Sequence, residues 1–196
     1  MLEKFKSYLV DKGGITEAEF QELAPVLQTK TIDKGTYLLR EGEVCKYAFF
    51  VEQGLLRSFS IDQAGKEHII QFAPENWIMS DISSNFFNES SDFFIEAIEN
   101  TEVVLLDKTF FNLSDKSSSY RKYNELLLQN HIRHLQKRVN LLLSASAEKR
   151  YLNFIQLYPD LTLRVSQWMI ASYLGITPES LSRVRKELAT KNFKPN

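Results

Sequence analysis

One stretch near the carboxyl end, residues 165–188, limits most strongly what this chain can fold into. Two runs with apolar residues at helical spacing flank Gly175, where a left-handed backbone conformation is expected. Thr177 followed by Pro178 is typical of the start of a helix, because threonine caps the first turn and proline has no N–H to leave unpaired. We expect the Ser166 hydroxyl to cap the preceding helix in the same way. The stretch therefore predicts two short helices joined by a tight turn.

The second of these helices separates into two faces. At about 100° per residue, the apolar side chains fall on one side: Leu181, Val184 and Leu188. The opposite side carries polar side chains: Glu179, Ser182, Arg183, Lys186 and Thr190. These residue types suit base edges in a major groove, since Arg pairs with guanine, Glu accepts from cytosine and Ser contacts either. An ordinary helical hairpin with a solvated charged face is the alternative, which the small Ala171, the Gly175 turn and the Thr-Pro cap together disfavour.

This segment resembles the helix-turn-helix of the Crp/Fnr family of bacterial transcription regulators. Glu179, Ser182 and Arg183 match the Glu-x-x-Ser-Arg pattern of that family's recognition helix. The resemblance implies a half-site with a TTGA-like core, read through its G·C pair. It also implies a wider set of DNA-binding residues: Ser166, Gln167, Thr177, Glu179, Ser180, Ser182, Arg183 and Lys186. The family's β wing follows the recognition helix, and only residues 191–196 follow here, which leaves wing contacts to DNA open.

The charges of the chain are segregated although the net charge is only −1. Residues 1–119 carry 11 Lys and Arg against 20 Asp and Glu, a net charge of −9. Residues 120–196 carry 13 basic against 5 acidic residues, a net charge of +8. A basic carboxyl-terminal part is what a phosphate backbone attracts, and the acidic part indicates that such a partner does not cover the whole molecule.

Short strands separated by turn residues dominate the region from Thr29 to Asp107. The candidate strands are 29–32, 36–40, 47–53, 55–61, 67–73, 76–80, 93–97 and 101–106. Eight short strands at this spacing suggest a double-sheet roll, or jelly roll. The run from Lys34 to Gly42, followed by Phe50 to Gly54, resembles the β-roll of cyclic-nucleotide-binding domains. The expected fold class is therefore α+β: a β-roll, a long helix and a helix-turn-helix domain.

The family resemblance also locates a candidate effector pocket. Cyclic-nucleotide receptors of the family hold the ligand with a Gly-Glu pair and, about ten residues on, an Arg-Ser pair. Those pairs fall here at Ser80-Asp81 and Ser91-Asp92, so Ser91 replaces the phosphate-binding Arg. No Lys or Arg lies between Lys66 and Lys108, while nine carboxylates do. An anionic phosphate needs cationic or backbone donors, so we predict that the chain does not bind cAMP or cGMP, and its effector stays unknown.

A long helix from Ser117 to Ser144 is predicted to connect the two parts. Apolar side chains recur on it at spacings of 4, 3, 4 and 3 residues, as in a coiled-coil seam: Leu128, Ile132, Leu135, Val139 and Leu142. A core helix of a single chain is the alternative. A two-fold dimer built on this seam would set two recognition helices about 34 Å apart, on a pseudo-palindromic site. The resulting division is 1–116 for the N-terminal helices and β-roll, 117–145 for the dimerisation helix and 146–196 for the DNA-binding domain.

Metal and enzyme chemistry find little support in the sequence. Cys45 is the only cysteine, and His68 is the only histidine of the strand region, where a metal-binding cupin would need a cluster. His131 and His134 are three residues apart on the long helix, but no third ligand is evident. We therefore expect no metal, no cofactor and no enzymatic activity.

Together these features predict a homodimeric, sequence-specific transcription regulator that binds double-stranded DNA and contacts RNA polymerase. The alternative is a ligand-binding or scaffold module whose helix-turn-helix is vestigial. No apolar run approaches the roughly 20 residues of a membrane span, and the first residues lack a signal-peptide pattern. The expectation is a cytoplasmic protein without a membrane partner.

Overall fold

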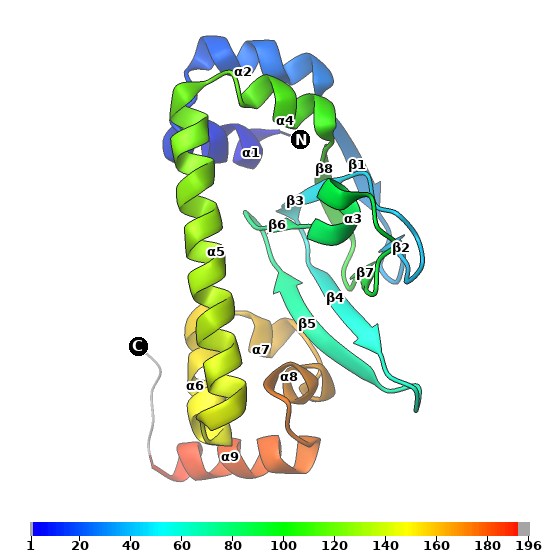
Figure 1. Cartoon of the computed structure of the whole chain (residues 1–196). Coiled ribbons are helices and arrows are strands. Elements are labelled where there is room, and N and C mark those ends of the chain that lie inside the picture. Colours follow the sequence, from blue (N-terminus) through cyan, green and yellow to red (C-terminus); the bar gives the residue numbers. More distant parts are fainter. Residues whose placement is uncertain (1, 192–196) are drawn as a thin grey trace. The chain divides into compact units, whose positions relative to one another are not determined.

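The fold of the chain comes from a computed structural model, which describes residues 2–191 (Figure 1). The contacts divide the chain into two compact units. The first holds Met1–Ile61 and Ile70–Gln129, and the second holds Asp62–Ile69 and Asn130–Asn196. Among the described residues, none of the helices has both the length and the apolar character needed to cross a bilayer.

Eight strands form the predicted double-sheet roll, and each lies within two residues of its expected bounds. They are β1 (Gln28–Ile32), β2 (Tyr37–Leu39), β3 (Ala48–Gln53), β4 (Leu56–Ile61), β5 (Glu67–Ala73), β6 (Ile78–Met79), β7 (Phe94–Ala97) and β8 (Thr101–Leu106). One sheet has the order β1-β8-β3-β6 and the other β2-β7-β4-β5. β1 and β3 both pair with β8 in the antiparallel direction. The α+β fold class with a β-roll is confirmed.

Alternation along β3 divides the core of the first unit in two. Successive side chains of a strand point to opposite faces, so Phe49 and Val51 join the cluster between the sheets. Phe50, between them, is fully buried in a second cluster with Phe5 and Phe110. Both faces of this strand are therefore covered, which explains why its first four residues, Ala48 to Val51, are all apolar.

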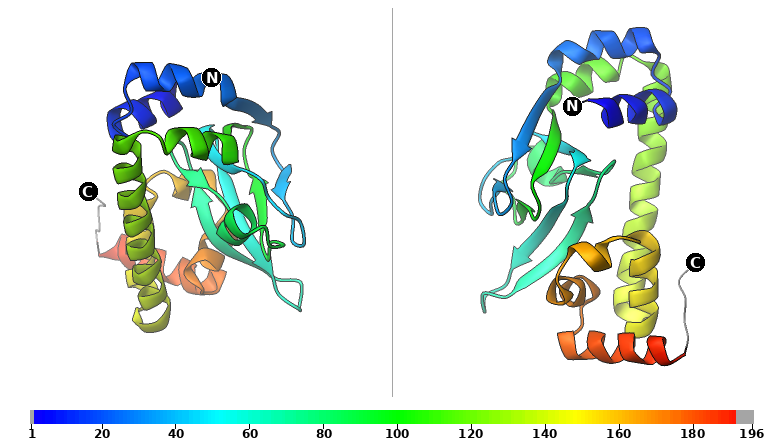
Figure 2. Two further views of the ribbon diagram at one scale, coloured as in Figure 1. Left: turned by 45° about the horizontal axis from the view of Figure 1, so that its top comes forward. Right: turned by 180° about the vertical axis from the view of Figure 1, so that it is seen from behind.

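The second cluster is completed by helices from both ends of the first unit. These are α1 (Glu3–Ser7), the π-helical turn Tyr8–Lys12, α2 (Glu17–Leu23), the 3-10 turn Ala24–Val26 and α4 (Lys108–Ser114). Figures 1 and 2 show α1, α2 and α4 lying together. Thr16 and Glu19 form a capping box at the start of α2: the Thr16 hydroxyl accepts from the Glu19 N–H at 3.2 Å, and the Glu19 carboxylate accepts from the Thr16 N–H at 2.8 Å.

Two further helices lie wholly or partly in the first unit. The short α3 (Ile82–Phe87) lies between β6 and β7 in the sequence. The long α5 (Ser118–Ser144) has the predicted length, and the Ser117 hydroxyl accepts from the Tyr120 N–H at its start. Its first residues belong to the first unit and the rest to the second.

Four helices follow α5 in the second unit: α6 (Ala147–Leu157), α7 (Leu161–Arg164), α8 (Gln167–Leu174) and α9 (Pro178–Thr190). From the sequence, a short strand is also expected over 162–165, before the first helix of the helix-turn-helix. That expectation is wrong, because Leu161–Arg164 is helical and only Val165 is extended. The N–H of Leu161 donates to the Tyr158 carbonyl, and the N–H of Val165 to the Leu161 carbonyl. Only helices follow α5 in the described residues, so an extended 162–165 would have no strand there to pair with. Local hydrogen bonds therefore determine the conformation of this segment.

Candidate nucleic-acid interface

Helix α9 is held against α6 and α8 by one apolar face. Leu181 is fully buried, and Val184 and Leu188 are each 6% exposed. Beneath them, the rings of Phe154 and Tyr173 lie 5.4 Å apart, centroid to centroid. The predicted apolar face of α9 is confirmed, and it fixes which side of the helix is turned outward.

The turn between α8 and α9 has the predicted geometry. Gly175 adopts φ 64° and ψ 37°, a left-handed conformation that favours glycine. Its successor Ile176 donates its N–H to the Ala171 carbonyl at 3.0 Å. Thr177 caps α9 by accepting from the Ser180 N–H at 3.2 Å, and Pro178 is the first helical residue.

The structure corrects the expectation that the Ser166 hydroxyl caps α8. Ser166 has the extended backbone of an N-cap residue, but its hydroxyl accepts no capping hydrogen bond. Its carbonyl instead accepts from the Met169 and Ile170 N–H groups. Backbone geometry alone therefore starts this helix.

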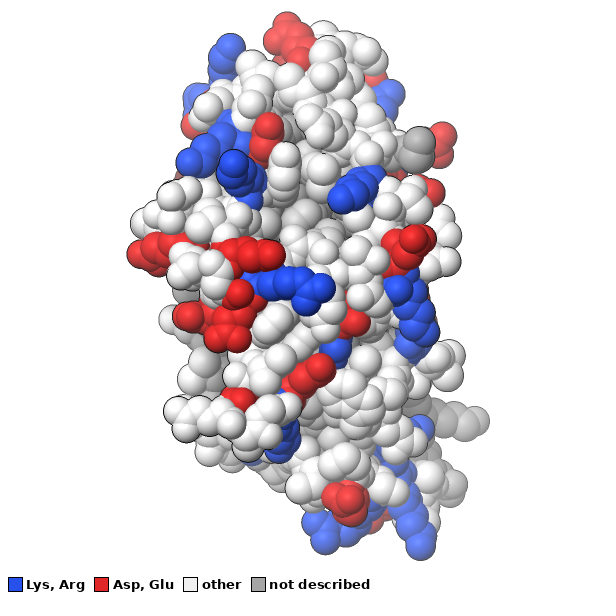
Figure 3. All heavy atoms as spheres, turned by 90° about the vertical axis from the view of Figure 1, so that its right-hand side faces the viewer, with Lys and Arg blue, Asp and Glu red and all other residues white. Residues whose placement is uncertain are grey.

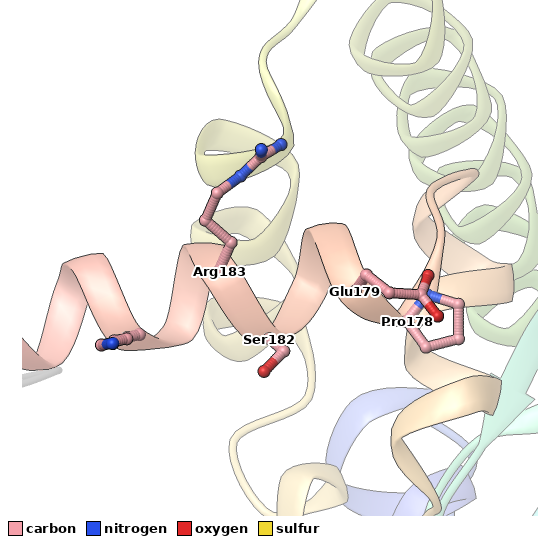
Figure 4. Close-up of a pocket in the computed structure, with 5 residues that line it drawn as sticks. Pro178, Glu179, Ser182 and Arg183 are labelled. Atoms are coloured by element: carbon pink, nitrogen blue, oxygen red, sulfur yellow. The ribbon is translucent and has the colours of Figure 1, made fainter.

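Five exposed side chains line a shallow, open hollow on the outer face of α9: Pro178, Glu179, Ser182, Arg183 and Lys186. In the view of Figure 4, Ser182 and Arg183 extend to different sides of the helix, and Glu179 lies next to Pro178 at its start. Hydrogen bonds from its own backbone N–H and from the Thr177 side chain lower the pKa of Glu179. The carboxylate is therefore ionised at neutral pH, ready to accept from a donor such as the cytosine amino group.

Two basic side chains, Arg183 and Lys186, line the same hollow as Glu179. Figure 3 shows Lys and Arg atoms gathered around a smaller cluster of acidic atoms at the lower end of the view, where α9 lies. Such a mixture of cations with one carboxylate suits a surface that combines phosphate contacts with base contacts.

The structure brings together four of the eight residues expected to bind DNA: Glu179, Ser182, Arg183 and Lys186. Ser166, Gln167 and Thr177 are exposed outside this hollow, and Ser180 is half-buried outside it. Sequence reasoning missed Pro178 as part of this surface, because the proline was assigned only to starting the helix. The signal that could have identified it is its spacing, four residues before Ser182 and eight before Lys186, which places the three side chains within about 80° of one another around the helix axis.

The proposed dimer seam is exposed along α5. Large apolar side chains rarely stay in water at regular spacing on a helix without a partner. The five seam residues are Leu128 (52% exposed), Ile132 (50%), Leu135 (48%), Val139 (55%) and Leu142 (37%). The single-chain alternative, in which this row fills the chain's own core, does not fit these exposures.

Two of the four candidate effector positions, Ser91 and Asp81, make hydrogen bonds within the chain. Ser91 is 2% exposed, and its hydroxyl donates to the Phe93 carbonyl and accepts from the Phe93 N–H. Asp81 is 7% exposed and caps α3 by accepting from the Ser84 N–H. Ser80 is half-buried and Asp92 is exposed.

The histidine pair on α5 has no third ligand among the described residues, where no group of three or more His, Cys, Asp or Glu side chains has metal-binding geometry. Burial, and then the charge of His134, lower the pKa of His131. The neutral form of His131 is thus favoured.

Comparison with known proteins adds independent observations. Residues 29–113 match the family model of the cyclic nucleotide-binding domain. The fumarate and nitrate reduction regulatory protein of Yersinia pestis is 27% identical over 193 residues, a match that takes in 91% of this chain and 76% of that protein. Two solved structures share the fold. FixK2 of Bradyrhizobium japonicum has a TM-score of 0.71 at 22% identity, covering 85% of this chain and 86% of that one. A transcriptional regulator of the CRP/FNR family from Thermus thermophilus has a TM-score of 0.66 at 15% identity, covering 85% and 88%.

Proposed function

The chain belongs to the Crp/Fnr family of transcription regulators, and on that premise we propose that it binds double-stranded DNA sequence-specifically as a homodimer. One observation supports this proposal more strongly than the others. Helix α9 keeps its apolar side against α6 and α8 and turns Glu179, Ser182 and Arg183 outward from a surface lined with cations. A helix of this kind fits the major groove, with its first turns at the base edges.

The roles of the outer side chains follow from their chemistry. Arg183 donates to guanine, Glu179 accepts from the cytosine of the same or the next base pair, and Ser182 adds a contact to either. Lys186 contacts phosphate and contributes affinity without sequence preference. Ser166, Gln167, Thr177 and Ser180, which lie outside the hollow, are proposed as flanking contacts to the DNA backbone.

Pairing of two chains along α5 supplies the second recognition helix. The exposed row from Leu128 to Leu142 is the proposed interface, and a two-fold dimer predicts a pseudo-palindromic site. Residues 1–116 form the sensory or protein-contact part, 117–145 the dimerisation helix and 146–196 the DNA-binding part. The segregated charges support this division, since the basic residues concentrate in the carboxyl-terminal part.

The β-roll is proposed as a sensor or protein-contact domain that does not take cAMP. Its candidate positions Ser80, Asp81, Ser91 and Asp92 offer no cation for a phosphate. RNA polymerase is the expected protein partner of a regulator of this family, the expected location is the cytoplasm, and no enzymatic activity is proposed. A scaffold role with a vestigial helix-turn-helix is disfavoured by the intact outer face of α9.

Selection of binding sites from random duplex DNA tests the proposal most directly. The expected result is an inverted repeat whose half-sites contain a common G·C pair, bound in a gel shift with an affinity that falls steeply with salt. Enrichment of no sequence, together with no binding of duplexes at low ionic strength, would favour the scaffold alternative.

A further inference from the structure

Helix α3, at the surface of the β-roll (Figure 1), exposes its apolar residues and buries its polar ones. Ser84 and Asn85 are buried, whereas Ile82 is 45% exposed, Phe86 56% and Phe87 70%. At about 100° per residue, the three apolar side chains fall within one arc of about 140°. An ordinary surface helix has the opposite arrangement, with its apolar face inward. The outer face of α3 is therefore an exposed apolar patch.

Contacts with neighbouring segments hold α3 in this orientation. The Ser84 hydroxyl accepts from the Cys45 N–H on the inner side of the helix. On the outer side, the rings of Phe86 and of Phe111 on α4 lie 5.7 Å apart, centroid to centroid. A rotation of α3 that buried Phe87 would break the first contact and separate the two rings. The apolar face is thus kept outward by the fold itself.

This orientation is unfavourable for the isolated chain. The rings of Phe86 and Phe87 remain largely in water, where apolar surface is destabilising. On the inner side, Asp81 Oδ2 and Asn85 Nδ2 are buried and find no hydrogen-bond partner among the described residues. Natural proteins depart from the usual patterns of burial mainly where function requires it. The outer face of α3 is therefore a candidate for contact with another molecule.

Carboxylates gather at the carboxyl end of α3. The Ser91 N–H donates to the Glu43 carbonyl at 2.8 Å, which sets the loop 41–43 beside the segment 89–92. Arg40, which precedes this loop, stacks its guanidinium on the Tyr37 ring, 4.0 Å from the ring centre. A rim of this charge repels nucleic acid and anionic membranes and attracts a basic partner. The exposed carboxylates of the rim are Glu41, Glu43, Glu89 and Asp92.

We propose that the outer face of α3, formed by Ile82, Phe86 and Phe87, is a docking surface for a partner protein that presents apolar side chains edged by Lys or Arg. An aromatic centre with a charged rim is the usual anatomy of such an interface. The inference rests on the protein-contact role proposed for the β-roll, to which it assigns a surface and a partner chemistry. It does not depend on DNA recognition by α9.

Two synthetic amphipathic peptides of about 18 residues, five helical turns, serve as probes. One consists of Leu and Lys, and the other has Glu in place of every Lys. Fluorescence anisotropy of the labelled peptides gives their dissociation constants with the full-length chain in the absence of DNA. We expect the Leu–Lys peptide to bind more tightly than the Leu–Glu peptide. Phe87→Gln should weaken its binding about tenfold, and Glu89→Lys should weaken it most at low salt.

Each variant has a matched control outside the patch. Leu163→Gln removes an apolar side chain that is 90% exposed on α7, and Glu22→Lys reverses an exposed charge on α2. Both controls should bind the Leu–Lys peptide as the natural chain does.

Equal binding of the Leu–Lys peptide by Phe87→Gln and by the natural chain would overturn the inference, and so would equal binding of the two peptides. A changed oligomeric state of Phe87→Gln in sedimentation would also overturn it, because the face would then belong to an interface between copies of this chain. These measurements contain no DNA, so a negative result leaves DNA binding intact. Failure to select any duplex would overturn the proposed DNA binding but not this inference.

Discussion

The hydroxyl of Ser172 on α8 is hydrogen-bonded to the backbone of β5 at Ile69 and at Glu67. It accepts from the Ile69 N–H at 3.0 Å and donates to the Glu67 carbonyl at 3.0 Å. Arg138 of α5 donates to the Ile69 carbonyl at 3.2 Å, and its guanidinium lies 3.7 Å from the centre of the Tyr173 ring. These contacts explain why residues 62–69 belong to the same compact unit as the carboxyl-terminal helices.

Ser172→Ala is expected to loosen this segment. The substitution removes two hydrogen bonds and leaves the Ile69 N–H and the Glu67 carbonyl without that partner, at a cost of about 1–2 kcal/mol. Amide hydrogen exchange should be faster at Ile69, and the free energy of unfolding should fall. Ser166→Ala is the matched control, because the Ser166 hydroxyl makes no capping hydrogen bond. Equal exchange at Ile69 in both variants would show that the hydroxyl does not hold the segment.

Local chemistry explains what could be predicted from the sequence. Thr16, Gly175 and Thr177 act through hydrogen bonds or backbone angles that involve residues at most five positions away, so their roles are visible in the sequence itself. The strands were predictable for a related reason, since glycine and asparagine turns mark their ends.

Contacts between distant residues were not predictable in the same way. The partner of Ser172 lies more than 100 residues earlier in the chain, and no local pattern indicates it. The segment 162–165 contains two β-branched residues, which favour a strand by composition, yet a strand also needs a neighbour to pair with. Pro178 was not predicted to line the hollow on the outer face of α9, because the same residue satisfies a local rule for starting helices.

Leu135→Glu is expected to dissociate the dimer. Leu135 lies in the middle of the exposed seam and is 48% exposed in the single chain. Pairing would bury two copies of its side chain, and the substitution would place two unpaired carboxylates in the same apolar interface. Sedimentation should show a monomer, with dimerisation weakened by about 3 kcal/mol or more. Lys137→Glu introduces the same charge on the same helix outside the seam, and it should leave a dimer. A dimer that survives Leu135→Glu would contradict the assigned interface.

Arg183→Ala is expected to relax recognition of one base pair. Arg183 is exposed on the outer face of α9 and is free to donate two hydrogen bonds to guanine. Its loss should cost about 1–3 kcal/mol on the selected site and much less on sites that lack the G·C pair. Competition gel shifts with single-base variants measure the difference. If Arg183→Ala discriminated at that base pair as well as the natural chain does, another side chain would have to recognise the pair.

Lys186→Ala is expected to weaken binding to all DNA sequences by a similar factor. A phosphate contact carries no base preference, and its removal lowers the slope of log K against log salt by about 0.9 per contact. A dimer has two copies of Lys186, so the slope should change by about 1.8. Lys46→Ala is the matched control, since Lys46 is exposed in the acidic part of the chain. A sequence-dependent loss with an unchanged salt slope would make Lys186 a base reader instead.

Addition of cAMP is expected to leave the melting temperature unchanged. The resemblance puts the phosphate-binding position at Ser91, which is 2% exposed and has its hydroxyl engaged with the Phe93 backbone. Asp92, the next residue, adds an exposed carboxylate beside that position. A ligand at 100 times its dissociation constant stabilises a protein by about 2.7 kcal/mol, a shift that thermal denaturation detects easily. The selected DNA duplex serves as the positive control for the same preparation. A saturable rise in melting temperature with cAMP would show that backbone donors alone hold the phosphate in this β-roll.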